Sequence, residues 1–87
     1  MDIERLTLEI ECTFRDYPID QIPARIAELE GIRKGETKRL DSYIERMKAG
    51  KKLQRHHMIA FRHAPAFIEE LTLIIRALRE GYAHRTA

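Results

Sequence analysis

The sequence predicts an all-α protein, a small three- or four-helix domain built on an antiparallel helical hairpin. Apolar residues recur every three or four positions over two stretches of similar length, and Gly50 separates the two stretches. This spacing places the apolar side chains on one face of each helix. Two such faces joined by a short turn pack against each other, so we expect residues 20–49 and 51–80 to form the two arms of the hairpin.

Length and composition support one folded domain over residues 1–87. A chain of this size buries roughly 60–65% of the surface that it exposes when unfolded. Its residues are 44% hydrophobic and 34% charged, with three Pro and four Gly, which is typical of a folded helical protein with a charged surface. A core this small commonly gains stability from a partner, and we therefore expect a homo-oligomer.

The cysteine content and the apolar runs bear on the compartment. Cys12 is the only cysteine, so no internal disulfide can form, and no charged and then apolar leader precedes it. No apolar run approaches the roughly 20 residues that are needed to span a bilayer. These features predict a cytoplasmic protein with no membrane partner.

Residues 1–17 form an N-terminal amphipathic element for which two periodicities fit. As a helix, the apolar residues Ile3, Leu6, Ile10, Phe14 and Tyr17 share one face, and Asp2 is a plausible N-cap. As a strand, residues 3–14 would alternate apolar and polar side chains from Leu6 to Phe14. We favour the helix, because a strand needs a partner and the chain contains no second strand-like stretch. The alternative is an N-terminal strand that pairs across a dimer.

The first arm, residues 20–49, follows Pro18, which ends the preceding element. Asp20 is a candidate cap, and Pro23 falls in the first turn, where its missing N–H costs little. Gly31 and Gly35 each weaken a helix by up to about 1 kcal/mol relative to Ala. The arm is therefore either locally weak or broken near residues 31–36. Its seam residues are Ile22, Ile26, Leu29, Arg33, Glu36, Leu40, Tyr43 or Ile44, and Met47.

The second arm, residues 51–80, begins after Gly50, which suits the left-handed position that ends many helices. Pro65 removes one helical hydrogen bond, so we expect a kink or a break there. Gly81 marks the expected end of the helix, with residues 81–87 as a tail. The seam residues are Leu53, His57, Ala60 or Phe61, Ala64, Ile68, Leu71, Ile75, Leu78 and Tyr82.

Charge is distributed unevenly along the chain. Residues 1–30 carry eight acidic and three basic side chains, whereas residues 46–68 carry six basic and no acidic ones, although the whole chain has a net charge of only +2. The basic segment indicates a surface that binds an acidic partner or another anion. The alternative is a solvated turn whose cations stabilise the end of a helix. The candidate binding residues are Arg46, Lys48, Lys51, Lys52, Arg55, His56, Arg62 and His63.

A second, narrow apolar strip lies on the opposite side of two of the expected helices. A chain this short has few side chains left to cover such strips, so we interpret them as contacts between copies of the chain. The residues of these strips are Leu8, Cys12, Ala66, Leu73 and Ala77.

Metal binding and catalysis have weak support. His56 and His63 share a helix face but are about 10.5 Å apart along the axis, too far to hold one ion. Cys12 lies at an apolar position without a nucleophile motif, and no carboxylate pair has an evident pocket to shift its pKa. We therefore expect no catalytic residues, no metal and no cofactor.

The predicted function is that of a non-catalytic regulatory protein, an inhibitor or an adaptor, which binds another protein through the basic turn. The acidic surface of that protein would be the contact. The alternative is that the same residues bind nucleic acid, or a nucleotide or other phosphorylated ligand. The segment has few aromatic residues for stacking on bases and no base-reading motif, which favours the protein partner.

Overall fold

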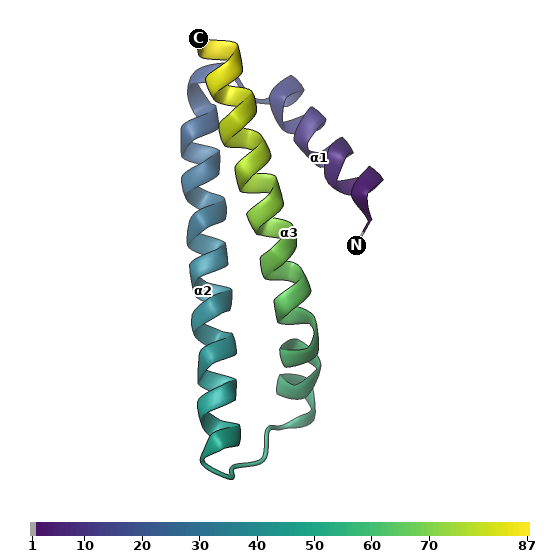
Figure 1. Ribbon diagram of the computed structural model, residues 1–87, viewed down its shortest axis with the longest axis vertical. Helices are drawn as coiled ribbons and strands as arrows, with labels where there is room; N and C mark the ends of the chain where they lie inside the picture. The colour runs from purple at the N-terminus through teal and green to yellow at the C-terminus, as the bar shows by residue number, and fades with distance from the viewer. Residues whose placement is uncertain (1) are drawn as a thin grey trace.

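The computed structural model describes residues 2–87, which form three α-helices and no strand (Figure 1). Helix α1 spans Ile3–Asp16, a 3₁₀ turn (η1) spans Ile19–Gln21, α2 spans Ile22–Lys48 and α3 spans Arg55–Thr86. Helices α2 and α3 pack side by side as an antiparallel hairpin, and α1 packs on α3 at the end away from the hairpin turn. The predicted all-α hairpin is confirmed.

The N-terminal element is a helix, so the alternative strand over residues 3–14 is wrong. Asp2 caps α1 as expected, because its side chain accepts a hydrogen bond from the backbone N–H of Arg5 at 3.0 Å. Leu6 is buried and Phe14 packs on the hairpin core, whereas Ile3 on the same face is 72% exposed. The apolar face of α1 is thus covered from Leu6 onwards, and Ile3 at the start of the helix is left exposed.

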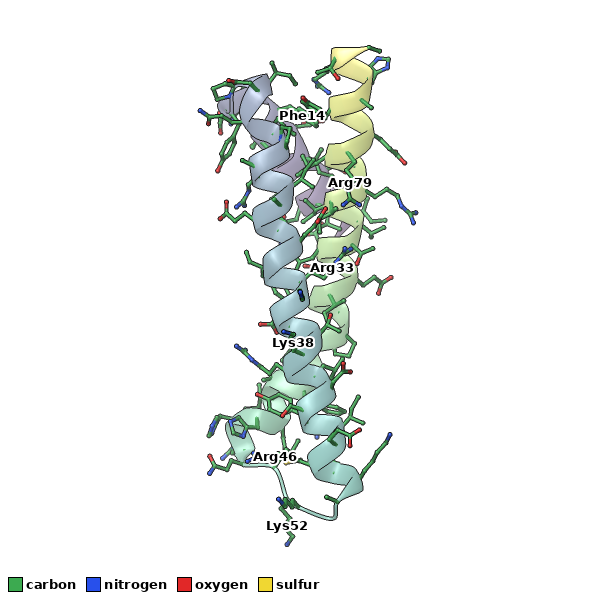
Figure 2. The ribbon with its side chains drawn as sticks, turned by 90° about the vertical axis from the view of Figure 1, so that its left-hand side faces the viewer. Phe14, Arg33, Lys38, Arg46, Lys52 and Arg79 are labelled. Atoms are coloured by element: carbon green, nitrogen blue, oxygen red, sulfur yellow. The ribbon has the colours of Figure 1, made fainter. Side chains whose placement is uncertain are left out.

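Helix α2 runs without a break through Gly31 and Gly35, so the expected alternative of two separate helices is wrong. Contacts with α3 support this weak stretch: the Arg33 guanidinium donates to the Thr72 hydroxyl at 3.3 Å, and Arg79 pairs with Glu30. Figure 2 shows Arg33 and Arg79 one above the other along the hairpin, with Arg33 nearer the turn. Tertiary contacts therefore outweigh the low helix propensity of glycine here.

The start of α2 differs from the expected cap at Asp20. Asp20 lies inside η1, and Gln21, which precedes the helix, makes no side-chain cap. The 3₁₀ turn supplies backbone bonds instead, with the N–H of Gln21 donating to Pro18 at 2.9 Å. Pro23 lies in the first turn of α2, as predicted.

Helix α3 begins and ends later in the sequence than the predicted second arm. It begins at Arg55 rather than at 51, continues through Pro65 and ends at Thr86, so neither a break at Pro65 nor an 81–87 tail is present. The first turns of α3 leave the line of the rest of the helix (Figure 1), which agrees with the alternative of a kink. The residues from Lys51 to Gln54, which were predicted to begin the second arm, form a loop instead.

Gly81 has a packing role and does not end the helix. A Cβ atom at this position would lie 2.6 Å from Cζ of Phe14, so the missing side chain leaves room for the aromatic ring. The guanidinium of Arg85 covers the same ring at 3.9 Å from its centroid. The last turns of α3 thus hold α1 in place.

The hydrophobic core lies at the end of the hairpin where α1 packs. The seam residues Ile22 and Leu29 of α2 and Leu71 and Leu78 of α3 belong to one buried cluster that also contains Ile26 and Ile75. Each fully buried aliphatic side chain contributes about 1.5–3 kcal/mol, so this end supplies most of the hydrophobic stabilisation. Nearer the turn, only Tyr43 and Ala64 are buried.

Within residues 2–87, none of the helices combines the length and the apolar character that crossing a bilayer requires.

The contact between Gly81 and Phe14 predicts different effects for two glycine substitutions. Gly31→Ala, which adds a Cβ with nothing within 4 Å, should raise the free energy of unfolding by up to about 1 kcal/mol. Gly81→Ala should give a smaller gain or a loss, because the Phe14 ring must move. Urea denaturation followed by circular dichroism measures both.

The Phe14→Leu variant tests whether the aromatic ring is the cause of the different effect at Gly81. Without the ring, Gly81→Ala should regain the benefit seen for Gly31→Ala. Equal stabilisation by both glycine substitutions in the parent chain would show that the Phe14 contact does not constrain Gly81.

Candidate functional site

The tip, residues 46–63, is organised by the way in which α2 ends. Gly50 adopts a left-handed conformation with φ of 76°, its N–H donates to the carbonyl of Met47, and the N–H of Lys51 donates to that of Arg46, both at 3.0 Å. These two bonds form a Schellman motif, which fixes the direction in which the chain leaves the helix. The prediction of Gly50 as the residue after the helix is confirmed.

The eight predicted binding residues are all exposed. Figure 2 shows Arg46 near the end of α2 and Lys52 projecting from the loop at the closed end of the hairpin. The set comes from three segments: the last turn of α2, the loop, and the first turns of α3. These residues are Arg46, Lys48, Lys51, Lys52, Arg55, His56, Arg62 and His63.

Ion pairs are less frequent among the cations of the tip than among the other basic residues. Within residues 2–87, five of the ten Lys and Arg residues outside the tip contact a carboxylate, namely Arg5, Arg15, Arg25, Arg39 and Arg79. At the tip, the only pair is between Lys48 and Glu45, at 3.9 Å. Because no acidic residue lies between Glu45 and Glu69, the sequence provides no local partner for the others. The tip is therefore a concentrated and largely unneutralised positive surface.

Helix dipoles explain why some of these basic residues lie at the tip, but they do not explain the others. Arg46 and Lys48 lie in the last turn of α2, where the negative end of the helix favours cations. Arg55 begins α3, where the helix end is positive and a cation is unfavourable. That first turn contains no acidic residue, and Gln54 supplies no side-chain cap. Stabilisation of helix ends thus does not account for the charge on the α3 side.

His57 lies behind the exposed cations, half-buried in the seam as predicted. Its ring packs on Tyr43, with centroids 5.3 Å apart, and on His56 at 4.1 Å. Its Nδ1 atom is buried and has no hydrogen-bond partner among the described residues. Burial lowers the pKa of His57 below its ordinary value, and repulsion by His56, Arg46 and Arg39 lowers it further. The imidazole is therefore held in its neutral form more strongly than an exposed histidine.

A second surface feature is a groove of about 500 Å³ between α1 and the hairpin. Leu8 and Cys12 line it from α1, Ile32 from α2, and Phe67 and Ile74 from α3. Of the five residues predicted to contact another copy, the structure places Leu8 and Cys12 here. The other three, on α3, are Ala66, Leu73 and Ala77, and they do not line the groove.

The groove could not be predicted from the sequence, because its presence depends on the angle between α1 and the hairpin. Phe67 belongs to the apolar face of α3 by its spacing, yet it is 41% exposed at the groove, as is Ile32 on α2. The periodicity of a single helix identifies its apolar face but does not give the angle at which another helix crosses it. No signal in the sequence would have separated these two residues from the core.

The described residues gather no metal-binding cluster. Within residues 2–87, no three His, Cys, Asp or Glu side chains lie close enough together to hold an ion. Comparison with protein-family models, with curated proteins and with solved structures gives no match to this chain.

The lowered pKa of His57 predicts a dependence of stability on pH. Between this pKa and about 6.5, the unfolded value, the unfolded chain binds more protons than the folded chain, so stability increases with pH. The contribution of His57 should be complete above about 6.5 and be lost as the pH falls towards its folded pKa. Urea midpoints measured on both sides of this window report the slope.

The His57→Phe variant keeps an aromatic ring against Tyr43 and should show a smaller slope. His84→Gln, which removes a histidine at the far end of α3, is the matched control and should keep the slope of the parent chain. An unchanged slope in His57→Phe would assign the pH dependence to other groups.

Proposed function

We propose that this protein is a non-catalytic regulatory protein that binds the acidic surface of another protein through its tip. The observation that carries the proposal is the set of exposed cations at the tip, of which only Lys48 has a carboxylate partner within residues 2–87. Exposed positive charges without internal partners attract a negatively charged surface and speed its association. Binding there would cover the partner's surface, as an inhibitor or an adaptor does.

The position of Arg55 supports a role in binding over a role in folding. A cation at the start of a helix opposes the helix dipole, and neither an acid in the first turn nor a cap relieves it. Charges that cost stability are common where a surface is kept for a partner. The Schellman turn at Gly50 adds a fixed direction to the loop, which limits the ordering that binding would require.

A protein partner is favoured over nucleic acid by the side chains available at the tip. Binding to single strands commonly relies on exposed aromatic rings that stack on bases. At the tip, Phe61 is half-buried and the neighbouring Tyr43 is buried. The exposed groups are Lys, Arg and His, which suit carboxylates and phosphates alike, so the measurement below includes both kinds of anion.

Reversal of charge at the loop tests the proposal. Lys51→Glu with Lys52→Glu should weaken binding to polyglutamate, an acidic polypeptide probe, at least tenfold, which is about 1.4 kcal/mol. The matched control is Lys34→Glu with Lys38→Glu, which makes the same change of charge at exposed positions on α2. Fluorescence anisotropy reports affinity, and circular dichroism should show unchanged helicity. Equal losses in both double variants would mean that only the net charge matters.

A random-sequence DNA duplex distinguishes the alternative function. If phosphate contacts dominate, the logarithm of affinity should fall linearly with the logarithm of salt concentration, with a slope of about −3 to −5 for four to six contacts. We expect weaker binding to the duplex than to polyglutamate at equal salt concentration. Tighter binding to the duplex, with a slope in that range, would favour the nucleic-acid function instead.

A further inference from the structure

The groove between α1 and the hairpin leaves apolar side chains without cover. Leu8 is 59% exposed there, and Phe67 and Ile32 are each 41% exposed. Contiguous exposed apolar surface of this kind marks interaction sites in proteins. Charged residues border the groove, among them Glu9 and Asp16 on α1.

The area of the molecule indicates how much surface is available to a partner. The chain exposes 6510 Å², about 1,100 Å² more than the roughly 5,400 Å² that the scaling law gives for a compact monomer of its mass. Its radius of gyration is 16.0 Å, against roughly 12 Å for a compact chain of 87 residues. A standard interface removes about 800 Å² from each partner. Covering one face of this elongated molecule by that amount would bring its exposed area close to that of a compact monomer.

The charge distribution favours a second copy of this chain as the partner that covers the groove. The α1 end of the rod contains most of residues 1–30, which carry eight acidic and three basic side chains, and the tip at the other end carries the basic segment. Two copies that lie antiparallel along the 51 Å axis place each acidic end beside a basic one. A parallel pair would place like charges together. Antiparallel pairing is thus favoured electrostatically.

The apolar residues of α3 are compatible with this arrangement. Ile59, His63, Ala66, Glu70 and Ile74 follow each other at intervals of three or four residues, so they lie along one face of the helix. The groove occupies the C-terminal part of this face. On the N-terminal part, Ile59 is 51% exposed and lies beyond the reach of α1, which spans only the upper half of the rod (Figure 1).

We propose that two copies of this chain form an antiparallel, two-fold symmetric dimer in which Ile59 of each copy enters the groove of the other. The symmetry axis would cross α3 near Ala66, midway between Ile59 and the groove floor. Each α1 would then contact the first turns of the partner's α3, with Glu9 and Asp16 of one copy near Arg55 and Arg62 of the other. The proposal concerns self-association, and because Arg55 and Arg62 also belong to the tip, a second copy and an acidic partner protein would compete for these two residues.

A cross-link tests the register directly. Cys12 is the only cysteine in the chain and lines the groove. Ile59→Cys should therefore form a disulfide between copies under mild oxidation, joining position 59 of one copy to Cys12 of the other, as a non-reducing gel and peptide mass spectrometry would show. Ile19→Cys is the matched control, because Ile19 is 42% exposed at the far end of the rod. It should cross-link much more slowly.

The mass in solution provides an independent measurement. Sedimentation from about 1 µM to about 1 mM, which spans binding free energies of about −8 to −4 kcal/mol, should show twice the chain mass of 10.3 kDa. Ile59→Glu should shift the association constant by more than tenfold towards the monomer with unchanged helicity, whereas Ile19→Glu should not. A monomer throughout this range, a larger assembly, or equal cross-linking from position 19 would overturn the proposal.

Discussion

The apolar seam between α2 and α3 at the α1 end is the constraint on which the rest of the structure depends. Ile22, Ile75 and Leu78 are its fully buried side chains, and the cluster around them receives Phe14 from α1. Once these contacts fix the register of the two arms, every other position along the hairpin is determined, including the distance between the core and the tip. Helix α1 packs mainly against α3, so its position also depends on this seam.

From this cluster towards the turn, polar interactions replace apolar ones. Arg79 and Glu30 pair near the core, and Arg33 reaches Thr72 in the middle of the hairpin. Beyond them the seam contains Tyr43 and the half-buried His57, whose Nδ1 atom lacks a partner. Hydrophobic stabilisation therefore decreases along the rod, and the tip is held mainly by helix geometry and by the Schellman bonds at Gly50. The positively charged tip and the hydrophobic core are therefore spatially separated.

The fold could be predicted from the sequence because its elements have strong periodic signals. The seam positions of both arms, the cap at Asp2 and the turn at Gly50 all depend on residues close in sequence, where spacing determines which side chains share a face. The end of α3 could not be predicted, because Gly81 is a common helix terminator and its packing on Phe14 is a contact across 67 positions. The exposure of all eight candidate tip residues could be predicted from their polarity. The groove could not be predicted, because it depends on how α1 crosses α3, which no local pattern encodes.

The separation of charge along the rod also affects how other molecules sense the protein. The Debye length is about 8 Å at physiological ionic strength, whereas the rod is 51 Å long. An approaching surface therefore experiences the near end alone, and the net charge of +2 describes neither end. An acidic surface attracts the basic tip and therefore orients a single copy of the chain with the tip towards that surface. In an antiparallel pair both ends present mixed charge, so only the monomer would be oriented in this way.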